Sequence, residues 1–212
     1  MGEIDDQSSI IHKKLVCSGV DVLTANEKTI FSKFISSLIE RTPKKLDIYK
    51  KASPIEDYLE NLKSVNPSIF EAIERNNIDI EAIRDNVTLS FMMERIIDPE
   101  FIDSINQMEW IIVEHAIDDE HFILGDDALI VDNGEDTNHE PSYIRIAISP
   151  SRLLILVAKS LDVDDDFIAL LVFTYNPIVI RSSKRYIISS KKLSDATHTK
   201  FNKALKELHT AG

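Results

Sequence analysis

The sequence has a single cysteine, and this scarcity excludes several kinds of site. Cys17 is one residue in 212, so the chain has no internal disulfide and no paired-cysteine metal motif. An isolated thiol is more often a small buried hydrophobe than a nucleophile, so we expect Cys17 to be buried and without a catalytic role. The scarcity of cysteine also predicts a reducing, cytoplasmic setting.

Long hydrophobic runs are absent as well. The N-terminus has neither the basic region nor the apolar stretch of a signal peptide, and no run approaches the roughly 20 apolar residues of a membrane-spanning helix. The six histidines show neither an HExxH pattern nor the close spacing of metal ligands. We therefore expect a soluble protein with no membrane contact, no metal site and no cofactor.

The chain does contain enough apolar residues for a proper core, since 43% of them are hydrophobic. The pattern of these residues changes after residue 107. Residues 1–107 predict a helical subdomain and residues 108–212 an α+β subdomain, joined as one continuous unit. The predicted fold class is α+β, with an N-terminal helical assembly packed on a small, mostly antiparallel sheet and with helices at the C-terminal end.

Helix-capping signals recur through the first part. Thr24-Ala-Asn-Glu27 is a capping box, so a helix should begin there. Pro43 disfavours helical geometry at Thr42, so this helix should end near Arg41. A shorter helix before it should close at Gly19, where glycine can take the left-handed cap conformation. Four further starts are marked by a polar cap residue, mostly with proline after it: Ser53-Pro54, Asn66-Pro67, Asp79 and Asp98-Pro99.

After Gln107 the apolar residues form short runs rich in Ile, Val and Leu, which are typical of strands. The runs predict strands at 108–116, 121–124, 128–132, 143–148 and 153–158. The segment that begins at Phe167 is ambiguous, because its β-branched residues suggest a strand, whereas its length and the preceding Asp162-x-Asp-Asp-Asp166 suggest a capped helix. Pro177 does not fit a central strand, so we favour a helix with a break or kink near Asn176-Pro177. A polar loop at 133–138, a strand at 185–189 and a final helix at 194–208 complete the prediction.

The most conspicuous candidate site is an acidic turn between two of these runs. Gly125 precedes Asp126 and Asp127 there. Closely spaced carboxylates suit hard cations and proton transfer. Asp126 is therefore the best catalytic candidate, as a base. Asp126 and Asp127 together are candidate ligands of a divalent cation, with Asp132 or His121 as a further ligand. The alternative, which we favour, is an Asx-type turn in which Asp126 accepts hydrogen bonds from local amides.

The net charge of −12 is unevenly distributed. Residues 109–166 carry a net −12, whereas residues 167–212 carry +6. The basic residues of the last segment suggest a phosphate or nucleic-acid contact through Arg181, Lys184, Arg185, Lys191 and Lys192. We favour the alternative that this segment packs on the acidic middle, with its charges solvated or paired. The overall acidity argues against a dedicated nucleic-acid binder.

Several short motifs follow one another in order between residues 24 and 195. They are Phe34-Ile-x-x-Leu38 with Arg41-Thr-Pro43, Met108-x-Trp110, Phe122-Ile-Leu-Gly-Asp-Asp-Ala128, Ser149-Pro150 with Leu153-Leu154, Asn176, and Arg185-Tyr-Ile-Ile-Ser-Ser190. The set resembles the domain-of-unknown-function family numbered 4238, an uncharacterised bacterial family. In that family a helix ending in Arg-Thr-Pro precedes a tryptophan strand, a Phe-Ile-Thr-Ser-Asp-Asn-Pro turn and an asparagine-bearing helix.

Two departures from the family pattern limit what the resemblance implies. Members of the family open with a His-His-x-x-Pro segment that has no counterpart here, which implies a shortened member or an excised part. The Ser-Asp-Asn-Pro of the turn is replaced by Gly125-Asp126-Asp127-Ala128, so only the first aspartate is kept. Any chemistry of the turn is then altered or lost, and the family has no established activity to transfer.

Two single residues are further candidates for binding a ligand. Arg41, at the end of its helix, suits a carboxylate or phosphate, although a cation at a helix C-terminus is stabilising for dipole reasons alone. Asn176 suits a polar ligand, although it is most simply explained as satisfying backbone groups where Pro177 removes a donor. Trp110, inside an apolar strand run, is most simply a core residue. We favour the structural explanation for all three.

Two functional classes follow from these observations. We prefer a non-catalytic protein-interaction or ligand-sensing domain of a prokaryotic-type cytoplasmic protein, with a protein partner or a homo-oligomer and no nucleic acid. The alternative is a metal-assisted hydrolase or nuclease that uses a divalent cation at Asp126 and Asp127, with the basic C-terminal segment as its phosphate contact.

Overall fold

The computed structural model describes residues 2–52, 55–76, 79–114, 121–127, 129–132, 141–183, 185–192, 195, 198–199 and 202–203. The polar loop expected at 133–138 lies outside the described residues. Of the final helix expected at 194–208, the residues that are described are helical.

Helices make up the first half of the chain, and one more follows the sheet. They are α1 (Gly2–Ser18), α2 (Ala25–Glu40), α3 (Pro43–Ala52), α4 (Ile55–Val65), α5 (Pro67–Arg75), α6 (Ile80–Ile96), α7 (Pro99–Gln107) and α8 (Asp165–Ser182).

Expected capping residues are found at the starts of α2, α6 and α7, whereas the start expected at Ser53-Pro54 lies outside the described residues. Thr24 and Glu27 form the full capping box of α2. The side chains of Asp79 and Asp98 accept backbone N–H groups at the starts of α6 and α7. Gly19 follows α1 with φ of 87°, the left-handed conformation expected of a glycine cap. The capping signals therefore located these helix ends correctly.

Helix α3 is a correction, because the sequence prediction ended helix at Arg41 and resumed it only after Ser53. Pro43 does end α2, but it also begins α3. Proline has no N–H to satisfy and its φ is already helical, so the first position of a helix suits it. The hydroxyl of Thr42 accepts the N–H of Lys45 at 3.3 Å and serves as a cap for the new helix.

The helix expected after Phe167 is confirmed as α8, which runs from Asp165 to Ser182 and is not interrupted at Asn176-Pro177, so only the expected break is corrected. Pro177 removes the hydrogen bond that the carbonyl of Phe173 would accept in a regular helix. Phe173 and Pro177 both lie on the exposed side of α8, where water can satisfy that carbonyl. The inner side of the helix keeps its contacts with the sheet.

The strands form two antiparallel sheets. They are β1 (Glu109–Glu114), β2 (Leu124–Gly125), β3 (Leu129–Asp132), β4 (Tyr143–Ser149), β5 (Arg152–Val157) and β6 (Ile187–Ile188). The larger sheet has the order β1-β5-β4-β3, and β2 pairs with β6 in a separate ribbon whose strands are shorter than predicted. The α+β class is confirmed.

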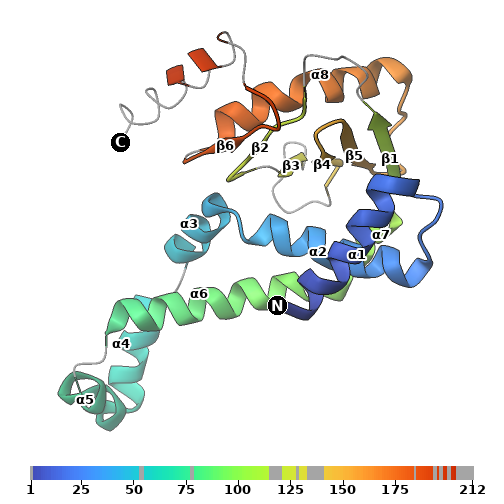
Figure 1. Cartoon of the computed structure of the whole chain (residues 1–212). Helices are drawn as coiled ribbons and strands as arrows, with labels where there is room; N and C mark the ends of the chain where they lie inside the picture. The colour runs from blue at the N-terminus through green and yellow to red at the C-terminus, as the bar shows by residue number, and fades with distance from the viewer. Residues whose placement is uncertain are drawn as a thin grey trace.

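The four-stranded sheet lies between α8 on one face and α1, α2 and α7 on the other (Figure 1). Successive residues of β5 show this arrangement, since Leu154 and Leu156 join the cluster beneath α1 and α2, whereas Leu153 and Ile155 join the cluster beneath α8. Both faces are covered, which explains why the strand runs are apolar throughout rather than alternating.

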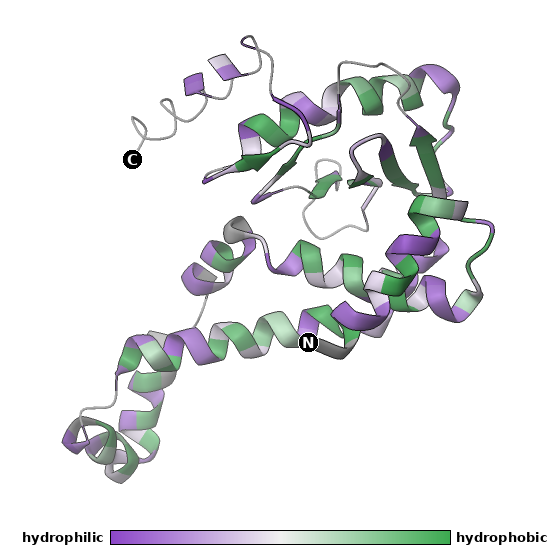
Figure 2. Cartoon of the chain, viewed as in Figure 1, coloured by the Kyte–Doolittle hydropathy of each residue, from purple (hydrophilic) through white to green (hydrophobic). Residues whose placement is uncertain are grey.

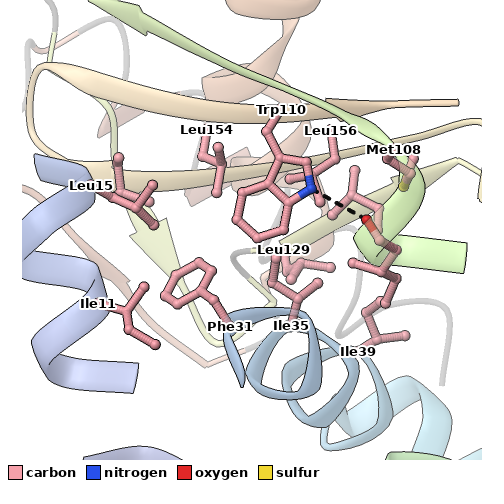
Figure 3. Packing of buried hydrophobic residues seen from close by; sticks show 13 residues of the cluster. Ile11, Leu15, Phe31, Ile35, Ile39, Met108, Trp110, Leu129, Leu154 and Leu156 are labelled. Atoms are coloured by element: carbon pink, nitrogen blue, oxygen red, sulfur yellow. Dashed lines mark hydrogen bonds between the residues drawn. The ribbon is translucent and has the colours of Figure 1, made fainter. Parts of the chain in front are cut away.

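Trp110 lies in the first of these clusters, as predicted. Its indole packs beside Phe31 and donates a hydrogen bond to the carbonyl of Ile105 at 3.3 Å (Figure 3). The cluster joins residues from both sides of the boundary expected between 107 and 108, so the helical part and the sheet share a core. Helices α4 and α5 extend away from this core (Figure 1). None of the described helices is both long and apolar enough to cross a membrane.

Candidate functional site

The segment that leads into the acidic turn is tied to α8 along its length. Asn176 accepts a hydrogen bond from the backbone N–H of Ile123 at 3.1 Å and donates one to the carbonyl of His121 at 2.9 Å. The side-chain amide thus pairs with the backbone as a neighbouring strand would. Asn176 serves the backbone of a distant segment rather than its own helix.

Gly125 allows this segment to approach the end of α8 closely. A Cβ at this position would lie 1.8 Å from Oγ and 3.0 Å from Cβ of Ser183, and 3.3 Å from Cγ1 of Val179. Ser183 is buried and its hydroxyl donates to the carbonyl of Val179 at 2.7 Å. Close approach of strand and helix therefore explains the glycine.

Asp126 and Asp127 form the turn that follows. The N–H of Asp126 points to the carbonyl of Tyr186 at 3.4 Å, which continues the pairing of β2 with β6. The carbonyl of Asp127 accepts the hydroxyl of Ser182 at 3.2 Å. Oδ2 of Asp126 is out of contact with solvent, and both residues are half-buried. The turn is held by backbone contacts to α8 and β6.

The two residues considered as additional metal ligands are engaged elsewhere. Asp132 accepts the hydroxyl of Tyr143 at 2.6 Å, and His121 contacts Ser190. In the described part of the chain, no three His, Cys, Asp or Glu side chains gather closely enough to hold a metal ion. The acidic turn therefore has no metal-ligand set among the described residues.

A buried polar network beneath α8 was not anticipated. Arg145, in the middle of β4, is only 1% exposed, and its Nη1 donates to the carbonyl of Leu171 at 2.7 Å and to the hydroxyl of Thr174 at 2.8 Å. Its guanidinium lies over the ring of Tyr143 at 5.3 Å. Burial lowers the pKa of Arg145 and raises that of Tyr143, whose hydroxyl is also held by Asp132.

A second buried group, Tyr175, supports an irregularity of β4. The pairing of β4 with β5 shifts register between Ala147 and Ser149, and the hydroxyl of Tyr175 accepts the N–H of Ala147 at 3.0 Å. Burial raises the pKa of Tyr175 to about 12. Arg145 and Tyr175 together fix α8 on the sheet through polar contacts. An arginine inside the apolar run Ile144–Ile148 was the one sequence signal of this network.

Arg41 and Cys17 lie on the other face of the sheet, among the helices. The Nη2 atom of Arg41 donates to Ser37 at 3.0 Å and lies 3.4 Å from a carboxylate oxygen of Asp5 in α1, so Arg41 links α1 to α2. Cys17 is exposed, contrary to the prediction, because it lies on the outer side of α1, whereas Leu15 faces the core.

Cavities in the described part of the chain lie away from these candidates. An open cavity of ≈ 510 Å³ lies between α7 and the end of β5, with Asp103 and Gln107 on one wall and Lys159 on the other. A smaller one of ≈ 250 Å³ lies between α2 and α7. None of Asp126, Asp127, Arg41 and Asn176 lines either of them. The structure brings Asn176 to the acidic turn and leaves Arg41 apart from both.

The outer face of α8 carries the most exposed large apolar side chain among the described residues. Phe173 is 79% exposed and Leu170 55% exposed, and Pro177 continues the same line. Hydrophobic residues take up most of α8 (Figure 2). The line is bounded by Asp166 at one end of the helix and Arg181 at the other, both exposed. Both charges are visible in the sequence, but their position at the two ends of an apolar line is not.

Comparison with known proteins gives a single positive finding. The model of the family described as "Protein of unknown function (DUF4238)" matches residues 1–193. No curated protein matches the chain, and no solved structure matches it.

Proposed function

Because the chain belongs to DUF4238, a family of proteins of unknown function, we propose its function from its own geometry: it is a non-catalytic protein-interaction domain of the cytoplasm. The outer face of α8 is the binding surface. The observation that carries this proposal is the exposure of Phe173, at 79%, in the middle of an apolar line on a well-packed helix. Exposed aromatic side chains of this kind are enriched where partners bind.

The rigidity of the surface supports the proposal. The inner side of α8 is buried through Leu171, Tyr175 and Val179, and the hydrogen bonds of Arg145 and Asn176 hold the helix in place. A side chain presented from such a fixed element loses little conformational freedom when a partner binds.

The test is site-specific photocrosslinking inside the native cell, with a photoreactive amino acid in place of Phe173. The matched control is Leu89, another exposed apolar residue, on α6. We expect a discrete adduct from position 173 and none of the same mass from position 89. Absence of any adduct specific to position 173 would contradict the proposal.

The hydrolase alternative has less support. Asp126 and Asp127 are held by backbone contacts, and neither lines the cavities described above. The basic segment offers exposed cations at Arg181 and Arg185, but next to an apolar line. We therefore propose a metal-assisted hydrolase or nuclease only as the second candidate function, and substitution of Asp126 tests it.

A further inference from the structure

We propose that the partner of α8 is a second copy of this chain, bound through an antiparallel α8–α8 pair around a two-fold axis beside Phe173. This inference rests on the interaction function proposed above and names the partner. It follows from the order of side chains along the exposed face of one helix.

The residues on the exposed face of α8 form pairs of positions that lie at equal distances on either side of a point next to Phe173. The members of this face recur every four, three, four and four residues: Asp166, Leu170, Phe173, Pro177 and Arg181. Such spacing places them along one side of an α-helix. The positions are symmetric about a point next to Phe173, so an antiparallel copy would place Leu170 opposite Pro177 and the two Phe173 rings beside each other.

The charges at the two ends are complementary under the same operation. An antiparallel pair places Asp166 of one copy opposite Arg181 of the other, and the two-fold axis makes this contact twice. Each of these residues is exposed, and neither forms an ion pair with another described residue. A parallel pair would instead oppose like charges at both ends.

The surroundings of both helix ends extend this complementarity. Asp162, Asp164 and Asp165 surround the N-terminal end of α8, and Arg185 follows its C-terminal end, all of them exposed. In the antiparallel pair the acidic end of each copy meets the basic end of the other. The helix dipoles also run in opposite directions, which favours the same orientation.

A second copy therefore fits this surface on both apolar and electrostatic grounds. A single helix pair is smaller than a standard interface, so we expect a reversible dimer with a dissociation constant on the order of 10 µM. The dissociation constant should rise with ionic strength, because the flanking ion pairs are exposed.

The test measures this dissociation constant by sedimentation equilibrium for the full chain and its variants. Phe173→Asp should weaken the dimer about 30-fold or more, as expected for a central aromatic contact. Leu89→Asp, the matched control on α6, should leave it within about 2-fold. Asp166→Arg and Arg181→Asp should each weaken it about 5- to 10-fold, and the double variant should restore it. Thermal melts should show that each variant is folded.

A disulfide provides the second measurement. In a Cys17→Ser background, Phe173→Cys should form an intermolecular disulfide on mild oxidation, whereas Leu89→Cys should not. A chain that stays monomeric at high concentration overturns the inference, and so does a dimer that resists Phe173→Asp or is not restored by the double charge reversal. If the chain is monomeric but position 173 still crosslinks to a different protein in cells, the interaction function stands and only the second copy is excluded.

Discussion

Replacing Gly125 with alanine should destabilise the fold by about 2 kcal/mol, because the added methyl group meets a buried and fixed neighbour. The new Cβ would lie 1.8 Å from Oγ of Ser183 and 3.0 Å from its Cβ. The hydroxyl of Ser183 is directed to the carbonyl of Val179, and rotating it away sacrifices that hydrogen bond. The strand must therefore move away from α8, with loss of packing along β2.

A double-mutant cycle with Ser183→Ala separates this clash from other causes. Ser183→Ala alone should cost about 0.5 to 1 kcal/mol, since it removes one hydrogen bond and leaves the carbonyl of Val179 with the N–H of residue 183. In that background Gly125→Ala should cost only about 1 kcal/mol, because the 1.8 Å contact is gone and the 3.0 Å contact remains. The coupling between the two sites should be about 1 kcal/mol.

The assay is equilibrium urea unfolding followed by far-ultraviolet circular dichroism and by the fluorescence of Trp110. The matched control is Gly19→Ala, which has no neighbour within 4 Å but has φ of 87°. It should cost about 1 kcal/mol through backbone strain alone, and Ser183→Ala should not change that cost. A loss below about 0.5 kcal/mol for Gly125→Ala, or zero coupling with Ser183→Ala, would refute the close-approach explanation.

Three further predictions concern pH and metal ions. Tyr175→Phe should cost about 1 to 3 kcal/mol at neutral pH, because it leaves the buried N–H of Ala147 without its acceptor. Because the folded pKa of Tyr175 is raised from 10.0 to about 12, its stabilisation is complete below pH 10 and is lost between pH 10 and 12, so urea midpoints of the variant should fall less steeply over that window. Hydrogen bonds from Lys14 and from Thr24 lower the pKa of Glu27 from 4.5 to about 2, so stability that is present above pH 4.5 is lost as the pH falls to 2. In the same assay, Glu27→Gln should lose less stability over that pH range than the wild type. Calorimetric titration with Mg²⁺, Mn²⁺ and Zn²⁺ should give the same heats for the wild type and for Asp126→Ala, and binding that is lost in the variant would favour the hydrolase alternative.

The local signals of the sequence were sufficient for most of the helix boundaries and for the fold class. Capping is a short-range interaction, so Thr24, Asp79 and Asp98 carry it in their own neighbourhood. The same signal was ambiguous at Pro43, because proline disfavours helix before itself and favours helix after itself. The prediction of a helix end near Arg41 rests on the first effect alone, whereas the second effect begins α3 at Pro43.

The acidic turn could be located from the sequence, but its environment could not. The contacts that hold it join residues more than fifty positions apart, as in the pairs Asn176 with His121 and Ser182 with Asp127. Capping signals and apolar periodicity carry no information about such pairs. The sequence shows a glycine at position 125, but the reason for it lies in the position of Ser183, which only the packing of β2 on α8 reveals.

The apolar residues on all sides of α8 explain two things: why the sequence did not decide between a strand and a helix there, and why we propose that this helix binds a partner. Its apolar residues occur on all sides, so periodicity alone did not decide between a strand and a helix. A helix that is apolar on all sides is stable in water only if each side is covered. The sheet covers the side of Leu171, Tyr175 and Val179, and the described residues leave the side of Phe173 open. A partner that covers the second side removes this exposure, and the opposed charges of Asp166 and Arg181 make a second, antiparallel α8 the surface that fits both the apolar line and its ends.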